Sequence, residues 1–204
     1  MLTALRSIMA EEVRMATNMA IRAVIDSISE ILGHRGTGII FRNIGFADIF
    51  ENPPDYNWEP CIPTTEQVKI YTELANLLGL NGAISIWRRI GYVNIKYTVE
   101  IAHVLDQFES LPPKEKYFEA TRLFCFGSGK GRPVANEVTG ADLDVFDCLL
   151  CEGYTSKKPI CSLYEGIMQY ACDWAFGKGV YIPREIKCKA KGDDTCYFVL
   201  TKKD

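Results

Sequence analysis

Four side chains in the last part of the chain have the types and spacing of ligands to a single metal ion. They are Cys161, Glu185, Cys188 and Cys196. Three thiolates and one carboxylate fill all four positions of a tetrahedral zinc ion, and a set without an open position is typical of structural rather than catalytic zinc. Such a centre would fasten a helix to a hairpin through metal bonds.

Cys188 and Cys196 lie in a predicted β-hairpin. Residues 180–189 and 195–201 are its predicted strands, and residues 191–194, Lys-Gly-Asp-Asp, have the composition of a turn. With the glycine at the centre of the turn, the two cysteines face each other with Cβ atoms about 5 Å apart. This distance suits two thiolates on Zn²⁺, with bonds of about 2.3 Å, and it also suits a disulfide. Free buried thiols are a third alternative.

A further cysteine pair, Cys148-x2-Cys151, precedes Cys161. A pair at this spacing can bind metal, act as redox-active thiols or pack as small apolar side chains. Together with the two hairpin cysteines it would form a four-cysteine metal site, and Glu185 and Cys161 would then lie outside that site. The spacing leaves these alternatives open.

Composition and charge exclude several classes of protein. The chain has 204 residues, of which 48% are hydrophobic and 24% charged, as is ordinary for a globular protein. The net charge of −3 and the lack of a long basic run argue against a nucleic-acid surface as the main function. No apolar run reaches the roughly 18 residues of a membrane span, and no secretory signal pattern is present. Eight cysteines without an export signal favour a reducing compartment, so we expect a cytoplasmic protein.

Helical periodicity dominates the first part of the chain. An apolar stripe predicts a helix over residues 10–32 that ends at Gly33. This segment also has methionines that suit contact with a partner helix, namely Met9, Met15 and Met19. The capping-box pattern Thr64-x-x-Gln67 predicts the start of another helix, which ends at Gly79.

The remaining elements follow from periodicity, prolines and glycines. We expect a strand or helical turn over 38–41, a loop over 51–63, helices over 81–108, 114–125 and 159–176, a loop over 127–140 and a strand over 143–147. Helices come first and strands later, without βαβ alternation. The pattern predicts an α+β fold in one domain, 1–204, with long N-terminal helices packed on a small, mainly antiparallel sheet closed by a metal-bound C-terminal hairpin.

Short motifs in the C-terminal block, residues 141–204, resemble the 4-vinyl reductase domain. They are Gly153-Tyr154, Pro159-Ile160-Cys161, Gly166, Tyr170-Ala171-Cys172, Gly177, Arg184-Glu185-Ile186-Lys187-Cys188, Gly192 and Cys196. Upstream, Leu78-Gly79 and Trp87-Arg88-Arg89-Ile90-Gly91-Tyr92 are similar to the family as well. The resemblance implies the fold of TRAPP-type trafficking subunits, of the ligand-sensing domain of aromatic-responsive transcription activators and, more distantly, of heme-based nitric-oxide sensors.

The resemblance also implies ligands and partners. In the aromatic-responsive sensors three cysteines and one glutamate hold a structural zinc, and the matching positions here are Cys161, Glu185, Cys188 and Cys196. The family further implies a homodimer, with the N-terminal helix, 1–35, as its contact. The sensors hold phenols with a histidine and a tryptophan. Leu143 stands at the tryptophan position, and neither His34 nor His103 matches the histidine, so a phenol is disfavoured and a larger, less polar ligand is expected.

Three functions are compatible with these features. The first is a domain that binds or senses a small apolar, hydrocarbon-like or ring-containing molecule, in a pocket lined by Trp87, Tyr97, Tyr164, Met168 and Trp174. The second is a tetrapyrrole-binding accessory or a vinyl reductase of (bacterio)chlorophyll-type metabolism. The chain has no dinucleotide motif to supply electrons, so catalysis is less favoured. The third is a TRAPP-like interaction scaffold.

Overall fold

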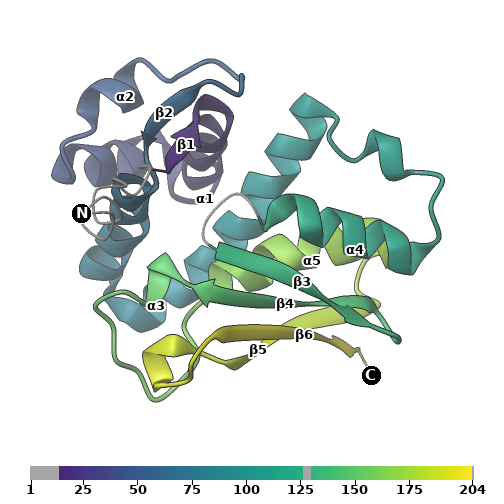
Figure 1. Ribbon diagram of the computed structural model, residues 1–204. Coiled ribbons are helices and arrows are strands. Elements are labelled where there is room, and N and C mark those ends of the chain that lie inside the picture. Colours follow the sequence, from purple (N-terminus) through teal and green to yellow (C-terminus); the bar gives the residue numbers. More distant parts are fainter. Residues whose placement is uncertain (1–13, 126–129, 204) are drawn as a thin grey trace, which may run out of the picture.

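The computed structural model describes residues 14–125 and 130–203 (Figure 1). The N-terminal part comprises β1 (Met15–Thr17), α1 (Asn18–Asn43), α2 (Ala47–Glu51), β2 (Pro60–Pro63) and α3 (Thr64–Ala102). The C-terminal part comprises α4 (Pro113–Phe124), β3 (Lys130–Asn136), β4 (Gly140–Asp147), α5 (Ser162–Phe176), β5 (Tyr181–Lys187) and β6 (Cys196–Lys202). Short 3₁₀ helices lie at η1 (Asp106–Phe108), η2 (Leu149–Cys151) and η3 (Lys189–Lys191).

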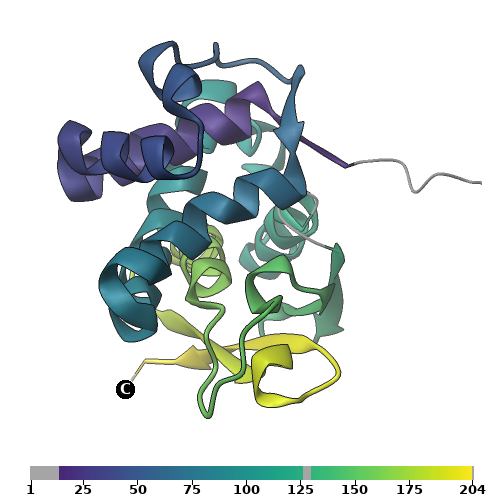
Figure 2. The ribbon, with the colours of Figure 1, turned by 90° about the vertical axis from the view of Figure 1, so that its left-hand side faces the viewer.

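Helices and one main sheet form successive layers. The sheet has the order β3-β4-β6-β5, and every neighbouring pair is antiparallel. Helices α4 and α5 pack against this sheet, α3 packs on α5, and α1 packs on α3 (Figures 1 and 2). The hairpin β5-β6 closes the C-terminal end and carries part of a cysteine cluster. The predicted α+β fold is confirmed.

Glycines bend both long helices where the sequence predicts that helices end. Gly33 has φ +73° within α1, and Gly79 has φ +69° within α3. An L side chain is strained in this conformation, so glycine is the residue that suits each bend. The chain returns to helix after both glycines, and residues 38–41 are helical rather than extended.

Helices α3 and α5 cross at a pair of glycines. A Cβ atom on Gly91 would lie 2.1 Å from the carbonyl oxygen of Leu163, and one on Gly166 would lie 2.0 Å from that of Arg88. The two backbones are therefore in direct contact, and only glycine allows it. Since α5 begins next to Cys161, the crossing fixes the start of that helix, and with it one candidate ligand, against α3.

The start of the first helix differs from the prediction. Residues 15–17 form β1 and pair with β2, and the helix starts only at Asn18. The Thr17 hydroxyl accepts a hydrogen bond from the Ala20 N–H (3.2 Å), so this side chain caps the helix. A helical stripe of apolar residues cannot reveal a strand that is made by pairing with a distant segment. Met9 and residues 10–13 lie outside the described residues.

Three further predictions are wrong in detail. Part of the predicted loop 51–63 forms β2, and residues 130–136 of the predicted loop 127–140 form β3, because each segment finds a partner strand that local composition does not show. The capping box is absent, since the N-cap position is Pro63 and makes no side-chain hydrogen bond. Among the described residues no helix has both the length and the apolarity to cross a membrane.

Candidate metal centre and ligand cavities

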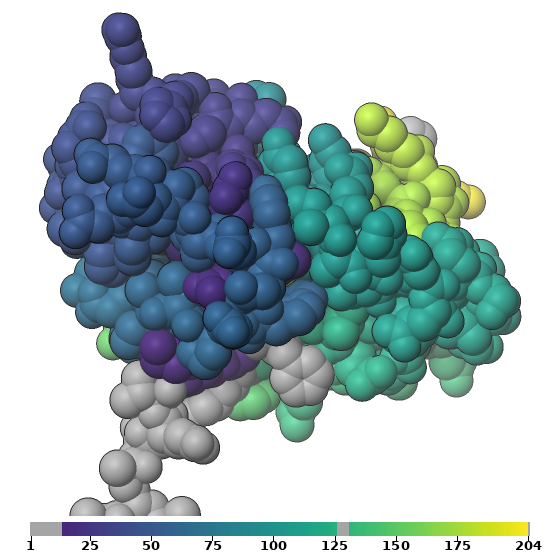
Figure 3. All heavy atoms as spheres, turned by 90° about the horizontal axis from the view of Figure 1, so that it is seen from above, coloured from purple at the N-terminus to yellow at the C-terminus, as the bar shows by residue number. Residues whose placement is uncertain are grey.

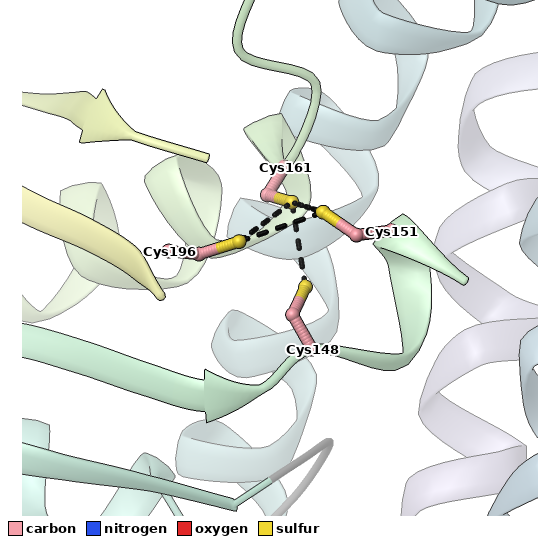
Figure 4. A group of neighbouring side chains, drawn as sticks. All are labelled: Cys148, Cys151, Cys161 and Cys196. Atoms are coloured by element: carbon pink, nitrogen blue, oxygen red, sulfur yellow. Dashed lines mark hydrogen bonds between the residues drawn. The ribbon is translucent and has the colours of Figure 1, made fainter. Parts of the chain in front are cut away.

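Five cysteines and one glutamate meet where the sheet, α5 and the hairpin come together (Figure 4). Each comes from the end of an element or from η2, so the fold rather than one local motif assembles the group. Cys148 follows β4, Cys151 ends η2, Cys161 precedes α5, Glu185 lies in β5, Cys188 follows β5 and Cys196 begins β6. We call these six residues the cysteine cluster. All six are buried.

The sulfur atoms of the cluster lie within contact distance of one another. Cys151 Sγ is 3.1 Å from Cys161 Sγ, 3.5 Å from Cys196 Sγ and 3.7 Å from Cys188 Sγ. Cys161 Sγ is also 3.7 Å from Cys196 Sγ and 3.4 Å from Cys148 Sγ. Sulfur atoms bound to one zinc ion at about 2.3 Å are about 3.8 Å apart in a tetrahedron. These separations are thus close to those of a thiolate metal centre.

Two overlapping groups of four could hold a metal ion. In the first, the ligand atoms of Cys161, Glu185, Cys188 and Cys196 all lie within 4.8 Å of one another, and this is the set expected from the sequence. In the second, the same limit holds for Cys148, Cys151, Cys161 and Cys196. The four-cysteine alternative considered from the sequence paired Cys148 and Cys151 with both hairpin cysteines, whereas this second group contains Cys161 in place of Cys188.

The first group fits a zinc ion by the state of its carboxylate. Glu185 Oε2 accepts a hydrogen bond from the Cys161 N–H at 2.8 Å. Glu185 Oε1 is buried and has no hydrogen-bond partner within the described ranges. Burial, followed by the neighbouring Cys188 thiol, raises the pKa of Glu185 to about 9. A cation or a proton is therefore needed at this oxygen, and a metal ion held by the adjacent thiolates would supply the charge.

Backbone and charged groups around the cluster fix its geometry. The Cys188 N–H donates to Asp193 Oδ2 at 2.7 Å, and the Lys189 N–H donates to Cys196 Sγ at 3.3 Å. The Glu185 N–H donates to Glu165 Oε1 at 3.0 Å, and the other carboxylate oxygen of Glu165 lies 3.2 Å from Arg88. Such outer contacts orient ligands and tune a metal site.

The hairpin register differs from the predicted one. Cys196 is paired with Val145 of β4, and Lys187 is paired with Tyr197 across the hairpin. Cys188 therefore does not face Cys196 as a cross-strand pair. It lies beyond the end of β5, where a register shift and η3 follow, and the chain turns back at Gly192, which has φ +96°. The two thiols still converge, because both lie within the first group of ligand atoms.

Two spaces for a ligand lie between the helices. A groove of about 310 Å³ is lined on one side by residues of β1 and α1 and by Trp58, and on the other by α3, Val104 and the end of α4. We call it the apolar groove. Figure 3 shows the boundary that it follows, between the purple and blue N-terminal part and the teal helices. Asn94 lies in its wall, and the buried Asn94 Nδ2 has no hydrogen-bond partner in the described parts of the chain.

The second space is an inner cavity between α4, α5 and the sheet. It is nearly filled by side chains, with about 10 Å³ free, and Leu143, Val145, Tyr164 and Met168 are in its wall. Phe124 lines both this inner cavity and the apolar groove, so its ring separates the two spaces.

The five residues predicted to line a pocket are dispersed in the fold. Tyr164 and Met168 line the inner cavity. Trp87 is fully buried and donates from Nε1 to the Tyr71 carbonyl at 3.1 Å. The Tyr97 hydroxyl donates to Glu30, and Trp174 Nε1 donates to Glu109 at 2.9 Å. Sequence reasoning missed Asn94, although a polar residue between Val93 and Ile95 on a largely apolar helix is a detectable signal.

Neither histidine lines the groove or the inner cavity. His34 stacks on Phe50 with ring centroids 4.6 Å apart. His103 lies at the end of α3, with 70% of its side chain exposed and Nδ1 3.3 Å from Asp106. Histidine ligation of a heme in these spaces is therefore not supported by the described residues.

Comparison with known proteins identifies the C-terminal block. Residues 142–202 match the 4-vinyl reductase domain. The uncharacterized protein MJ0745 of Methanocaldococcus jannaschii is 41% identical over 84 residues, which are 41% of this chain and 42% of that protein. The match thus spans less than half of the relative's length.

Solved structures of similar fold include two kinds of sensory domain. The phenol-responsive sensory domain of the transcription activator PoxR, solved with phenol, has a TM-score of 0.56 and 17% identity over 72% of this chain and 77% of that one. A protein from a study of heme distortion in the H-NOX family has a TM-score of 0.59 and 16% identity over 92% and 95% of the two chains. At these identities the likeness is one of fold. The match to the 4-vinyl reductase domain and the fold shared with PoxR confirm the family resemblance predicted for the C-terminal block.

Proposed function

We propose that this protein is a small-molecule-binding domain that takes an apolar, ring-containing ligand and is stabilised by a structural zinc ion. The observation that carries the proposal is the apolar groove with its unpartnered amide. A groove of about 310 Å³ with a few converging polar groups is typical of ligand sites in proteins. The PoxR domain, which is phenol-responsive and was solved with phenol, is consistent with this class of ligand.

The chemistry of the groove narrows the ligand class. Met19, Ile95, Leu123 and Phe124 give it an apolar lining. The buried Asn94 amide can donate one hydrogen bond, and leaving a buried donor unpaired costs about 1–3 kcal/mol. A ligand with an apolar ring and one acceptor, such as a hydroxyl or carbonyl oxygen, would remove this cost. A purely aliphatic hydrocarbon would leave it in place.

The cysteine cluster would hold the zinc ion. Cys161, Cys188 and Cys196 supply three thiolates, and Glu185 supplies the carboxylate oxygen that has no other partner within the described ranges. When bound, the metal cross-links the start of α5 to the β5-β6 hairpin. The role is structural, because four protein ligands leave no position for a substrate.

An interaction scaffold of the TRAPP type is the second candidate. The nearly filled inner cavity favours it, since a protein that works through its surface needs no empty interior. A tetrapyrrole ligand has less support, because neither His34 nor His103 lies at the two spaces. Dimerisation through residues 1–35 stays a prediction that light scattering can check. Within that segment Met19 is 2% exposed and belongs to the core, so a dimer contact would need Met15 instead.

A binding experiment separates the two candidates. Purified full chain is titrated with N-phenyl-1-naphthylamine, a probe whose fluorescence rises in apolar sites, and phenol and 2-naphthol are then added as competitors. We expect saturable binding that Thr98→Trp abolishes, because this side chain would fill the groove. Ile101→Trp, on the exposed side of the same helix, should bind like the wild type. A wild type without saturable binding would support the scaffold, and equal binding by both variants would exclude the groove as the site.

A further inference from the structure

The cysteine cluster contains more ligands than one metal ion needs. We propose that Cys151 can replace Glu185 as the fourth ligand, beside the shared thiolates of Cys161, Cys188 and Cys196. The centre then has two interchangeable coordination states, one with three thiolates and a carboxylate and one with four thiolates. This inference rests on the zinc centre proposed above and deepens it.

The position of Cys151 carries the proposal. Its sulfur lies 3.1, 3.5 and 3.7 Å from the sulfurs of Cys161, Cys196 and Cys188. Those three ligand atoms lie within 4.8 Å of one another. The four sulfurs thus form a compact tetrahedron, with edges comparable to the roughly 3.8 Å of a four-thiolate zinc site. Cys148 makes no such contact with Cys188 in the described structure, so it does not complete the same set.

The two coordination states have the same charge. Three thiolates with one carboxylate and four thiolates both carry four negative charges. In the exchange, the thiol of Cys151 loses its proton as it becomes a ligand, and the carboxylate of Glu185 gains one as it leaves. The protonated Glu185 is then a hydrogen-bond donor in a buried place where its anion would lack a partner. No oxidant or reductant is involved.

Burial also distinguishes Cys151 from the shared ligands. Cys161, Cys188 and Cys196 are 0% exposed, whereas Cys148 and Cys151 are 5% and 7% exposed. An open hollow of about 490 Å³ borders Cys148 and Cys151 and reaches Glu152 and Lys189. Cys151 therefore lies between the buried ligands and solvent, on the side where a metal ion can enter or leave.

Zinc affinities of four variants test the exchange. The variants Glu185→Gln, Cys151→Ser, the double variant of both, and Cys148→Ser combined with Glu185→Gln are titrated with zinc against a chromophoric chelator. We expect each single variant to keep one zinc per chain within about tenfold of the wild-type Kd. The double variant should bind more weakly by over about 100-fold, beyond the loss that an outer-contact residue causes. The Cys148 control should behave like Glu185→Gln alone.

Cobalt spectra give an independent measure of the ligand set. Sulfur-to-cobalt charge-transfer absorption should be stronger in Glu185→Gln, with four thiolates, than in Cys151→Ser, with three. The proposal is overturned if Glu185→Gln loses zinc as fully as Cys188→Ser, if it cannot be obtained folded with zinc, or if the Cys148 control binds as weakly as the double variant. A wild type that binds no zinc would instead contradict the zinc centre itself, so the two failures are distinguishable.

Discussion

The cysteine cluster and the apolar groove treat their polar groups in opposite ways. At the cluster, six candidate ligands converge, and the N–H groups of Cys161, Cys188 and Lys189 already donate to side-chain acceptors. In the groove, one amide nitrogen of Asn94 faces apolar side chains without a partner among the described residues. The first region has more ligands than a metal ion needs, and the second lacks one partner. We infer that the cluster holds its occupant for stability, whereas the groove takes its occupant reversibly.

Removal of the metal should have the largest effect and should separate the two regions. We expect a strong chelator, or Cys188→Ser, to cost about 4 kcal/mol and to lower Tm by about 10 °C. Amide hydrogen exchange should accelerate in β5 and β6 and stay slow in the buried part of α1, which is held by apolar side chains. Cys61→Ser, at a cysteine outside the cluster, is the matched control. Complete metal loss with an unchanged melting curve would refute a structural role.

The helix crossing that joins the two regions should be nearly as sensitive. Gly166→Ala would place a Cβ 2.0 Å from the Arg88 carbonyl oxygen, so α3 and α5 would have to separate. We expect a loss of about 3 kcal/mol in urea unfolding, the upper end of overpacking costs. Gly82→Ala on α3, where the nearest atom is Leu78 Cβ at 3.2 Å, should cost less than about 1 kcal/mol. Equal costs for the two variants would mean that the crossing is not rigid.

The wall between the groove and the inner cavity offers a smaller test. Phe124 lines both spaces and is half-buried, so Phe124→Ala should cost about 2 kcal/mol, less than a fully buried ring, and should join them. Saturating toluene should then raise the Tm of this variant more than that of the wild type, because an apolar space without water binds apolar molecules. Phe118→Ala on the same helix, which borders a different hollow, should show no extra gain. A similar gain in both variants would place the toluene elsewhere.

The sequence predicts the parts of this fold that depend on local chemistry. Gly33 and Gly79 interrupt helices where expected, because positive φ is a property of glycine itself. The ligand types of the cluster are equally visible, since thiols and a carboxylate at metal spacing are rare. The place of Cys151 in the cluster is not visible, because it depends on how η2 folds back after β4 and meets β6.

The pocket prediction shows the limit of periodicity. An aromatic stripe on a helix marks a buried face, but it does not tell whether the neighbouring space is filled. Trp87 packs fully and bonds to the Tyr71 carbonyl, whereas Tyr164 reaches the inner cavity. The pairing of β1 with β2 was missed for a related reason, since a contact between distant segments has no local pattern.

Asn94 provides the finest test of the comparison, because its stability effect should have the opposite sign. Replacing the unpartnered amide by an apolar side chain of similar size, Asn94→Leu, should stabilise the free protein by about 1 kcal/mol, since a buried donor without a partner in the described structure is removed. The same change should weaken binding of 2-naphthol about tenfold and leave naphthalene unaffected, because only the first offers a hydroxyl oxygen to the amide. Urea unfolding and competition against the fluorescent probe measure both effects. A gain in stability without loss of 2-naphthol selectivity would show that the amide is no part of ligand recognition, and a loss of stability would show that it has a partner when the groove is empty.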